Sequence, residues 1–344
     1  MFRKYPKIEN AYKEPVITAI TNRGIHKKTQ WHVFEKIDGS NLGIIVTDNG
    51  IEFMKRTSII KAGDGFFNIH RIKKKYTDCC LELYQAIKHA YKGVVQIILY
   101  GELYGGIYPD HDVDKYINRN VFYSPTLEYI AFDILLKIKD TSGNVNERFE
   151  QWLTYDEYEP LLQRARIPYL KPLMKGTFEE ALQYQNDFVT TLPALHGLKP
   201  TETNNIVEGV VIKPVQNILL KGNKIMIKNK NDANQEIMDR SAVNKKFKFK
   251  VNMPKNLAPK IEAIYQYITE PRLNAVLSKI GVVQNTKSDF SKVLKAFSGD
   301  ILEEYVSDYT LSKKELKQVK KIMGSATLLI VREYLESLGE PTTE

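Results

Sequence analysis

The spacing of apolar residues changes once along this chain, and that change constrains the fold more than any other feature. Up to about residue 235, short runs rich in Val, Ile and Tyr alternate with segments of helical spacing, which is the pattern of half-buried strands and covering helices. After about residue 254 the strong patterns all have helical spacing. We therefore predict a mixed strand-and-helix domain over 1–238, a basic linker over 239–253 and a small all-helical domain over 254–344.

Turn and capping residues sharpen this prediction. The triplet Asp48-Asn49-Gly50 joins two apolar runs, 42–46 and 51–54, as the turn of a β-hairpin does. Gly281 is typical of a helix end, and Ser312 with Glu315 has the pattern of a capping box. Further strands are expected at 31–36, 94–100, 129–138, 206–212 and 224–228, and helices at 80–91, 178–188, 259–268, 272–280, 290–297, 300–305 and 315–336.

Positive charge exceeds negative charge, with 50 Lys and Arg against 41 Asp and Glu, a net charge of +9 and a pI near 9.1. Such a balance fits a polyanionic partner, but it equally describes a merely basic soluble protein. The densest stretch, 240–250, holds five positive residues and no negative one. Alternation from Lys246 to Lys250 would place lysines on one face of an extended segment and phenylalanines on the other. That segment is either a solvated strand or a contact for backbone phosphates.

Several classes of protein do not fit this sequence. The longest apolar runs, such as 94–100 and 326–331, are far shorter than the roughly 18 residues of a membrane span. The first residues lack the apolar core of a secretory signal. Cys79 and Cys80 are the only cysteines, so no disulfide framework or four-ligand zinc site is available. We expect a soluble, cytoplasmic protein of a reducing compartment, with no membrane partner.

The sharpest local feature is the string Glu35-Lys36-Ile37-Asp38-Gly39-Ser40-Asn41. A Lys-x-Asp-Gly string alone is weak, since chance supplies it in about one chain in ten of this length. Its position between two strand patterns makes the motif more informative, because the glycine turn would hold Lys36 at the mouth of a sheet. A lysine is a nucleophile only when deprotonated, which burial or neighbouring cations promote. The functional interpretation therefore predicts more cations and anionic ligand groups nearby.

Later segments supply such groups in order. Arg56 closes the hairpin, Glu102 lies among glycines at a strand end, Phe132 lies within a strand, and Glu208 and Lys213 flank Gly209–Ile212. Lys228 and Lys230 are two residues apart, so both point to one face of a strand. Two inward ammonium groups are costly unless an anion such as phosphate meets them. Each feature alone has an ordinary structural explanation, but together they indicate a site for an anionic ligand.

This ordered set resembles the nucleotidyltransferase motifs of covalent lysyl-nucleotide enzymes, which are polynucleotide ligases and messenger-RNA capping guanylyltransferases. It is most similar to the phage-type RNA ligase 2 family, whose relatives include the RNA-editing ligases of trypanosome mitochondria. Asn41 favours this branch, because DNA ligases and capping enzymes usually have Arg there. The opening Met1-Phe2-Arg3-Lys4-Tyr5 and the helical segments 272–281 and 300–304 also resemble the family. The other branches usually append an OB-fold, whereas the tail here shows no run of short alternating strands.

The resemblance implies an α+β nucleotidyltransferase domain with antiparallel sheets, followed by a small all-α domain. It implies an RNA ligase that uses ATP and Mg²⁺ or Mn²⁺ and joins 3′-OH and 5′-phosphate RNA ends at nicks in duplex RNA. Lys36 would carry AMP, and Lys228 and Lys230 would contact its phosphate. The implied nucleotide contacts are Glu35, Ile37, Asn41, Arg56, Glu102, Phe132, Glu208 and Lys213, the implied metal contacts through water are Asp38, Glu102 and Glu208, and Arg272 and Asp300 would serve later steps on RNA.

One residue departs from the family pattern, since the phage prototype has His where this chain has Asp38. The departure leaves open any role taken from that histidine, and an acidic group there favours metal contact. Two alternatives stay open as well: another enzyme of the superfamily, either a capping guanylyltransferase or a DNA ligase, and a basic RNA-binding protein without catalysis. We expect a monomer that binds RNA, in the host cytoplasm if the chain is viral.

Overall fold

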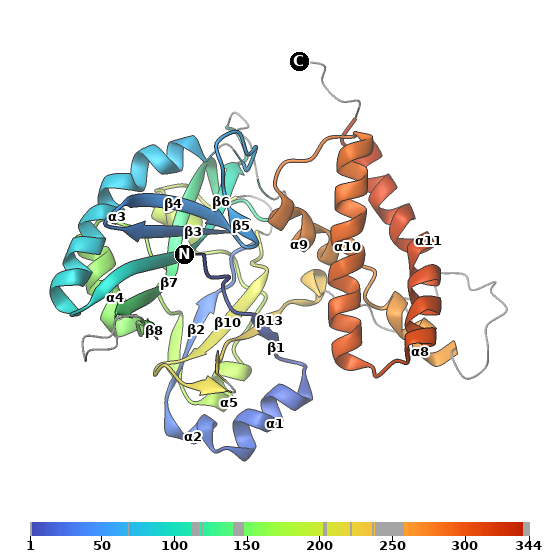
Figure 1. Ribbon diagram of the computed structural model, residues 1–344, viewed down its shortest axis with the longest axis horizontal. Coiled ribbons are helices and arrows are strands. Elements are labelled where there is room, and N and C mark those ends of the chain that lie inside the picture. Colours follow the sequence, from blue (N-terminus) through green and yellow to red (C-terminus); the bar gives the residue numbers. More distant parts are fainter. Residues whose placement is uncertain are drawn as a thin grey trace. The chain divides into compact units, whose positions relative to one another are not determined.

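The computed structural model describes residues 2–67, 69–111, 117, 120–139, 148–201, 205–220, 222–235, 237 and 258–339 (Figure 1). The chain divides into two compact units, Met1–Asn231 and Asp232–Glu344. The predicted linker 239–253, the basic stretch 240–250 and the predicted domain limits at 238 and 254 lie outside the described residues. Among the described residues, no helix combines the length and the apolar character needed to cross a bilayer.

Two sheets form the frame of the N-terminal unit. One has the strand order β5-β4-β3-β6-β7-β8, formed by Ser58–Ile59, Gly50–Lys55, Ser40–Thr47, Val94–Ile107, Ser124–Lys139 and Arg148–Trp152. The other has the order β1-β13-β10-β2-β9, formed by Glu9–Asn10, Ile227–Lys230, Gly209–Pro214, Trp31–Glu35 and Met174–Gly176. A two-stranded ribbon pairs β11 (Leu219–Leu220) with β12 (Asn223–Lys224). Neighbouring strands are antiparallel except β1 and β13, which confirms the predicted α+β class.

Helices pack against both sheets. They are α1 (Glu14–Asn22), α2 (Ile25–Lys28), α3 (His70–Ala90), α4 (Tyr155–Arg164), α5 (Phe178–Leu182) and α6 (Leu192–Leu195). The longest, α3, buries Ile72, Tyr76 and Leu83 against Leu99 and Tyr129 of the six-stranded sheet. A separate core places Phe178 of α5 against Trp31 of β2. The short helix α6 instead places Leu192 in a cluster with Phe34 and Ile37, beside the loop that carries Lys36.

The C-terminal unit is helical in its described residues, 232–235, 237 and 258–339, which contain no strand. It consists of a short 3-10 turn, η1 (Asp232–Asn234), and the helices α8 (Ala258–Tyr265), α9 (Glu270–Ile280), α10 (Lys287–Asp308) and α11 (Lys313–Ser337). The unit has its own apolar core, in which Phe297 and Ile301 of α10 meet Val331 of α11. The predicted capping box begins α11 at Ser312, and the predicted helix stop ends α9 at Gly281.

The structure corrects several predicted boundaries. The helical segments 290–297 and 300–305 are one helix, α10, which continues through Gly299, because packing along its length outweighs the roughly 1 kcal/mol that an interior glycine costs. The helix predicted over 178–188 ends at Leu182, although Phe188 still packs near the same core. The strand predicted over 224–228 is split, since β12 ends at Lys224 and β13 begins at Ile227.

Candidate nucleotide site

The loop that carries Lys36 connects the two sheets, because β2 ends at Glu35 in one sheet and β3 begins at Ser40 in the other. Its backbone is fixed at both ends. The Lys36 amide donates to the Gly209 carbonyl at 2.9 Å, and the Asp38 amide donates to the Tyr123 hydroxyl at 2.8 Å. A Cβ at Gly39 would lie 2.4 Å from the Leu103 carbonyl oxygen, so glycine is required there. The loop therefore holds Lys36 between the two sheets, whereas the sequence had indicated only the mouth of one sheet.

Lys36 meets a carboxylate from the opposite strand end. Its Nζ forms an ion pair with Glu208, whose other oxygen lies 2.5 Å from Lys230 Nζ. The side chains of Glu208 and Lys230 are only 7% and 6% exposed, whereas that of Lys36 is 18% exposed. Burial opposes the charge on Glu208, but Lys230 and Lys36 outweigh it and lower the pKa of this carboxyl. Three predicted residues thus form one ionic cluster.

Gly209 makes this cluster possible. Its φ is +144°, and a Cβ there would lie 2.2 Å from the Asn229 carbonyl oxygen. Only glycine allows so close an approach of β10 to β13. The strand predicted from 206 accordingly begins at Gly209, and Glu208 leaves the ladder beside Lys230. Lys228 lies on the same strand as Lys230, half-buried and in register with Val211.

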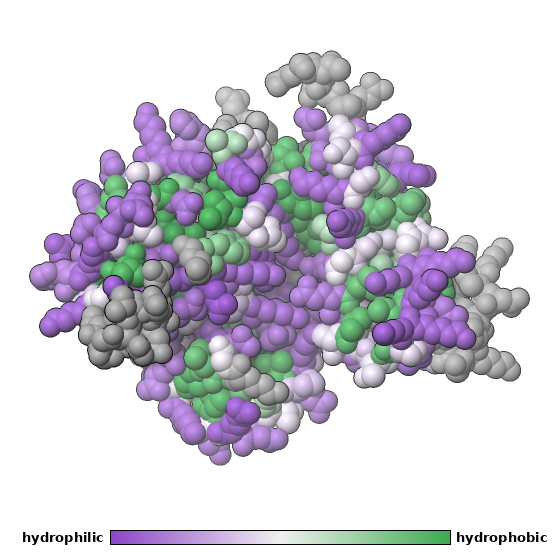
Figure 2. Space-filling model, in the orientation of Figure 1, coloured by the Kyte–Doolittle hydropathy of each residue, from purple (hydrophilic) through white to green (hydrophobic). Residues whose placement is uncertain are grey.

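The six-stranded sheet contributes a second group of charges. Burial raises the pKa of Glu102 to about 8, and Glu208 and Asp38 add to the rise while Lys36 and Arg56 oppose it. These groups act on one another only because they lie close together. The site therefore combines three carboxylates with three cations. These groups are Asp38, Glu102, Glu208, Lys36, Arg56 and Lys230. On the face of this unit shown in Figure 2, hydrophilic side chains gather over the stretch between the two sheets.

Asn41 leaves a polar atom without a partner in this region. It lies opposite Glu102 in the β3–β6 register, and its Nδ2 donates to the Gly101 carbonyl at 3.4 Å. Its Oδ1 is buried and has no hydrogen-bond partner among the described residues. A buried acceptor without a donor costs stability, so such an atom points to a ligand that donates to it.

Phe132 and Lys213 lie together on facing strands. Lys213 Nζ is 5.3 Å from the centroid of the Phe132 ring and donates to the Phe132 carbonyl at 3.1 Å. The half-buried Phe132 packs against the apolar cluster that contains Ile37, so the aromatic ring is linked to the Lys36 loop. The predicted aromatic and the lysine loop are therefore parts of one site.

Behind Phe132 lies a buried network that sequence analysis did not assign. Asp133 accepts hydrogen bonds from Lys213 at 2.9 Å, from Lys224 and from the Tyr5 hydroxyl. Burial opposes the charge of Asp133, yet both lysines outweigh it and lower its pKa. Burial lowers the pKa of Lys224 to about 8. The one signal in the sequence was an aspartate inside a strand of Ile and Leu, which is rare unless that residue is paired.

Glu35, a predicted nucleotide contact, directs its carboxylate elsewhere. It accepts hydrogen bonds from the hydroxyls of Thr190 and Thr191 and from the Thr191 amide at 2.9 Å. Burial raises its pKa, although these three donors oppose the rise. The carboxylate thus holds the 190–191 loop against the end of β2, directly before Lys36.

Arg272 and Asp300, predicted to act on RNA, belong to a network inside the C-terminal unit. Arg272 has no exposed side-chain surface, and its Nη1 lies 3.0 Å from Asp300 and 3.2 Å from Glu304. Lys279 Nζ approaches the other oxygen of Asp300 at 2.6 Å. The network joins α9 to α10, so its visible role is to fix these helices to each other.

The described residues contain no group of three or more His, Cys, Asp or Glu side chains arranged to bind a metal directly. Asp38 and Glu208 nevertheless lie close enough to Glu102 to add to the rise in its pKa that burial causes. Carboxylate oxygens are the ligands that Mg²⁺ and Mn²⁺ prefer, often through retained water. The donor set thus fits a divalent cation held through water rather than in a closed protein cage.

Comparison with known proteins gives two family matches. Residues 29–230, more than half of the chain, match the family described as RNA ligase, and residues 252–327 match the one described as T4 RNA ligase 2 C-terminal. Two similar solved structures are Naegleria gruberi RNA ligase mutants, one with AMP and Mn and one with ATP and Mn. Both are 17% identical to this chain, over 67% and 68% of its length, with TM-scores of 0.42 and 0.43. The matches span 56% and 57% of those two chains.

Proposed function

This chain belongs to the RNA ligase family, and from that premise we propose that it is an ATP-dependent RNA ligase that joins a 3′-hydroxyl end to a 5′-phosphate end at a nick in duplex RNA. The observation that carries the proposal is the cluster of Lys36, Glu208 and Lys230 between the two sheets. It sets one nucleophilic side chain beside a second cation that can bind phosphate. Phosphoryl transfer relies mainly on positioning and on charge neutralisation, which this arrangement supplies.

In the first step, Nζ of Lys36 attacks the α-phosphorus of ATP. A phosphorus–nitrogen bond forms, the bond to pyrophosphate breaks, and the Nζ proton leaves to solvent. Before attack, Lys36 must part from Glu208, whose negative charge Lys230 still balances. Lys228 and Lys230 then face the phosphate of the lysine-bound AMP.

Other residues would hold the nucleotide during this step. We propose that Phe132 stacks on adenine, with Lys213 behind the ring, and that Glu102 binds a ribose hydroxyl. Asn41 Oδ1, which lacks a donor in the structure, accepts from a donor group of the ligand. Arg56 lies near enough to Glu102 to lower its pKa, and from there it neutralises phosphate charge.

A divalent cation fits the same place. Asp38, Glu102 and Glu208 would hold Mg²⁺ or Mn²⁺ through water, and the cation, when bound, neutralises charge that develops on the phosphates. Its positive charge also favours the ionised form of Glu102 over the protonated form.

Two further transfers complete ligation. AMP passes from Lys36 to the 5′-phosphate of RNA, which frees the lysine and forms an RNA-adenylate. The 3′-hydroxyl then attacks that phosphate, loses its proton and releases AMP. Because Arg272 is fully buried, we propose that it and Asp300 support these steps by holding α9 against α10 rather than by touching RNA.

The test is covalent labelling. Purified protein with Mg²⁺ and α-labelled ATP is expected to retain label after denaturation, and Lys36→Ala is expected to retain none. A labelled protein is then tested on duplexes whose 3′-hydroxyl strand ends in RNA or in DNA. Label from GTP alone would assign the protein to the capping branch, and sealing of DNA ends alone would assign it to the DNA ligases. Absence of label from both nucleotides, with RNA still bound, would refute the proposal in favour of a binding protein.

A further inference from the structure

The first turns of α11, in the C-terminal unit, carry a row of exposed lysines (Figure 1). The row consists of Lys313, Lys314, Lys317, Lys320 and Lys321. At 3.6 residues per turn, these residues fall within an arc of about 120° and extend for about 12 Å along the helix. Val319 and Met323, which belong to the core of this unit, lie on the other side of the same turns. The five lysines are called the lysine face below.

The charge of the lysine face is not neutralised within the described part of the chain, where no carboxylate pairs with any of its ammonium groups. Glu315 is the one acidic residue between positions 313 and 324, and it lies outside the arc. Lys260 Nζ donates to Glu315 at 2.7 Å and the Ser312 amide donates to it at 2.8 Å, and both bonds lower the pKa of Glu315 to about 2. This carboxylate therefore serves the helix cap and the pair with α8.

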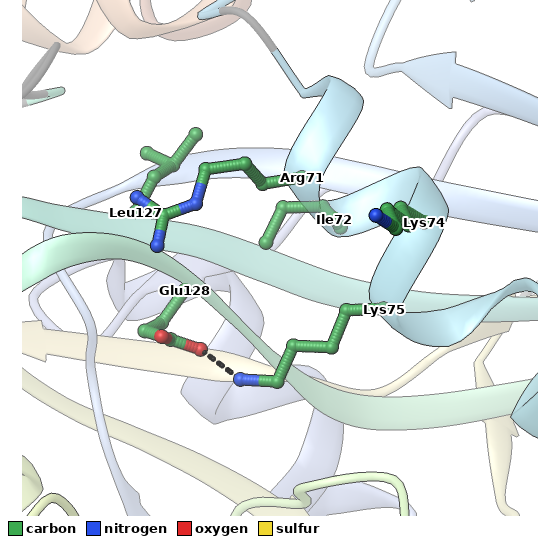
Figure 3. A pocket seen from close by; sticks show the side chains of 6 residues that line it. All are labelled: Arg71, Ile72, Lys74, Lys75, Leu127 and Glu128. Atoms are coloured by element: carbon green, nitrogen blue, oxygen red, sulfur yellow. Dashed lines mark hydrogen bonds and ion pairs between the residues drawn. The ribbon is translucent and has the colours of Figure 1, made fainter.

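Lysines elsewhere on the protein do meet carboxylates. Figure 3 shows Lys75 extending from α3 toward Glu128 of β7, with its Nζ 2.8 Å from that carboxylate. In the C-terminal unit, Lys279 Nζ lies 2.6 Å from Asp300. The charges of Lys75 and Lys279 thus have a partner inside the chain, whereas the lysine face presents its charge to solvent.

The stability of α11 does not account for the lysine face. Lys317 is four residues from both Lys313 and Lys321 and three residues from both Lys314 and Lys320. Like charges at these spacings are neighbours on the helix surface and repel one another. Lysines in the first turn also oppose the helix dipole. The face therefore weakens the helix unless anions meet it.

The chemistry of the lysine face favours a nucleic acid over a membrane or another protein. A helix that binds a bilayer surface inserts an apolar face, but these turns of α11 bury Val319 and Met323 in the unit's own core. A protein interface needs apolar or aromatic anchors and is poor in lysine, and no apolar side chain lies within the arc between positions 313 and 324. Phosphates of a nucleic acid require only cations.

Resting on the proposed function, we propose that the lysine face binds backbone phosphates of the RNA duplex that this protein seals. Lys313, Lys317 and Lys321 repeat about every 6 Å along the helix, so their ammonium groups can meet successive phosphates of one strand. Contacts of this kind hold a nucleic acid without reading its sequence. The lysine face therefore serves the two steps on RNA and not the adenylation of Lys36.

The experiment removes three charges and follows RNA binding and adenylation separately. The α11 variant is Lys317→Gln/Lys320→Gln/Lys321→Gln, which leaves the capping box of Ser312 and Glu315 intact. Glutamine and lysine have similar helix propensities, and no ion pair among the described residues is broken. Circular dichroism should therefore give the same helix content before and after substitution.

The matched control is the α10 variant Lys287→Gln/Lys292→Gln/Lys295→Gln, which removes the same charge from three exposed residues of the same unit. The probe is a fluorescent nicked RNA duplex with a 5′-phosphate. It is titrated by anisotropy at about 50, 100 and 200 mM salt, where phosphate contacts respond steeply.

We expect the α11 variant to bind the duplex at least about tenfold more weakly, with a salt slope shallower by about 2 to 3, because each lost phosphate contact lowers the slope by about 0.9. The α10 variant should stay within about twofold of the unaltered protein, because charge at a distance is screened. Labelling of Lys36 by ATP without RNA should be the same in all three proteins. Sealing by the α11 variant should be slow at limiting RNA and recover at high RNA.

A second variant keeps the charge and changes only the side chains. Lys317→Arg/Lys320→Arg/Lys321→Arg should bind the duplex within about twofold of the unaltered protein, since arginine also pairs with phosphate. Weak binding by this variant would contradict a role of the face as a set of positive charges.

Three other results would overturn the inference. The first is the same affinity and salt slope in the α11 and α10 variants, which would mean that position on the unit does not matter. The second is a higher ATP requirement for labelling in the α11 variant. The third is unchanged RNA binding with lost binding to vesicles of anionic phosphatidylserine, which would assign the face to a membrane surface.

Failure of the proposed function would look different, because Lys36 of the unaltered protein would then take no label. RNA binding that still depends on Lys317, Lys320 and Lys321 would in that case support the lysine face as an RNA-binding surface without ligation.

Discussion

Replacing Glu208 by Gln tests the ionic cluster that carries the proposed function. The carboxylate is 7% exposed and balances Lys36 and Lys230, and Gln keeps its size but removes its charge. Removing one partner of a buried ion pair costs about 3–5 kcal/mol, because the other charge stays buried. Lys36 is 18% exposed and can turn toward water, so we expect the lower end, about 3 kcal/mol. For a unit of this size that free energy lowers the unfolding midpoint by about 6–12 °C.

Tryptophan fluorescence measures this change in the correct unit. The only two tryptophans, Trp31 and Trp152, both belong to the N-terminal unit. Their thermal transition therefore reports the unit that contains Glu208. The control is Glu82→Gln, which breaks an exposed pair with Arg166 at 3.1 Å and should cost less than about 1 kcal/mol.

A second substitution tests why Glu208→Gln is expected to lose stability. If unpaired cations destabilise Glu208→Gln, then Lys230→Met should cost less in that variant than in the unaltered protein, because it removes one of them. If Lys230→Met costs the same free energy of unfolding in Glu208→Gln and in the unaltered protein, Glu208 and Lys230 do not interact. A midpoint for Glu208→Gln that matches the Glu82→Gln control would refute the reasoning from burial.

Two further outcomes follow from the site. Because burial raises the pKa of Glu102 to about 8 from its ordinary 4.5, folding takes up a proton between those values, so stability should fall as pH rises from 4.5 to 8. In Glu102→Gln, the free energy of unfolding should depend less on pH between 4.5 and 8. Urea unfolding at several pH values measures this dependence, and the same dependence in both proteins would contradict the assigned pKa. Asn41→Leu removes an unpaired buried acceptor, so the unliganded protein should lose less than about 1 kcal/mol while ATP binds about tenfold more weakly. Calorimetric titration with ATP checks the second part, and equal affinity would show that Asn41 Oδ1 meets no ligand.

Local signals in the sequence predicted the elements that depend on neighbouring residues. The turn at Asp48 and Asn49 closes the β3–β4 hairpin, and Ser312 caps the start of α11, because turn and cap chemistry acts within a few residues. The helix predicted over 178–188 was too long, because an apolar residue such as Phe188 can pack near a core without being helical. Around Gly299 the prediction divided one helix into two, because the packing of α10 outweighs the low helix propensity of glycine.

The ionic contacts of the site were not predictable in the same way. Ordered motifs indicated which residues would meet, but not that Lys36 would pair with Glu208, which is 172 positions away. Nor did they indicate that Tyr5 would bond Asp133, at a separation of 128. Such pairs follow from the strand order of two sheets, and only the folded chain brings them together. A buried carboxylate needs a donor, but the sequence does not say which of many donors will reach it.

Two carboxylates of the site, the buried Glu208 and the half-buried Glu102, have pKa values shifted in opposite directions. Lys36 and Lys230 lower the pKa of Glu208, whereas burial and its acidic neighbours raise that of Glu102. One ionised carboxylate therefore pairs with both lysines, and the raised pKa of the second carboxyl favours its protonated form. A phosphate that draws Lys36 away leaves Glu208 paired with Lys230, and a cation bound beside Glu102 would favour the ionised form of that carboxyl. Nucleotide and cation should accordingly bind with positive cooperativity and release protons on binding, and the amount released should fall in Glu102→Gln when titrated in buffers of different ionisation enthalpy. Equal proton release in both proteins would show that Glu102 does not titrate with the ligand.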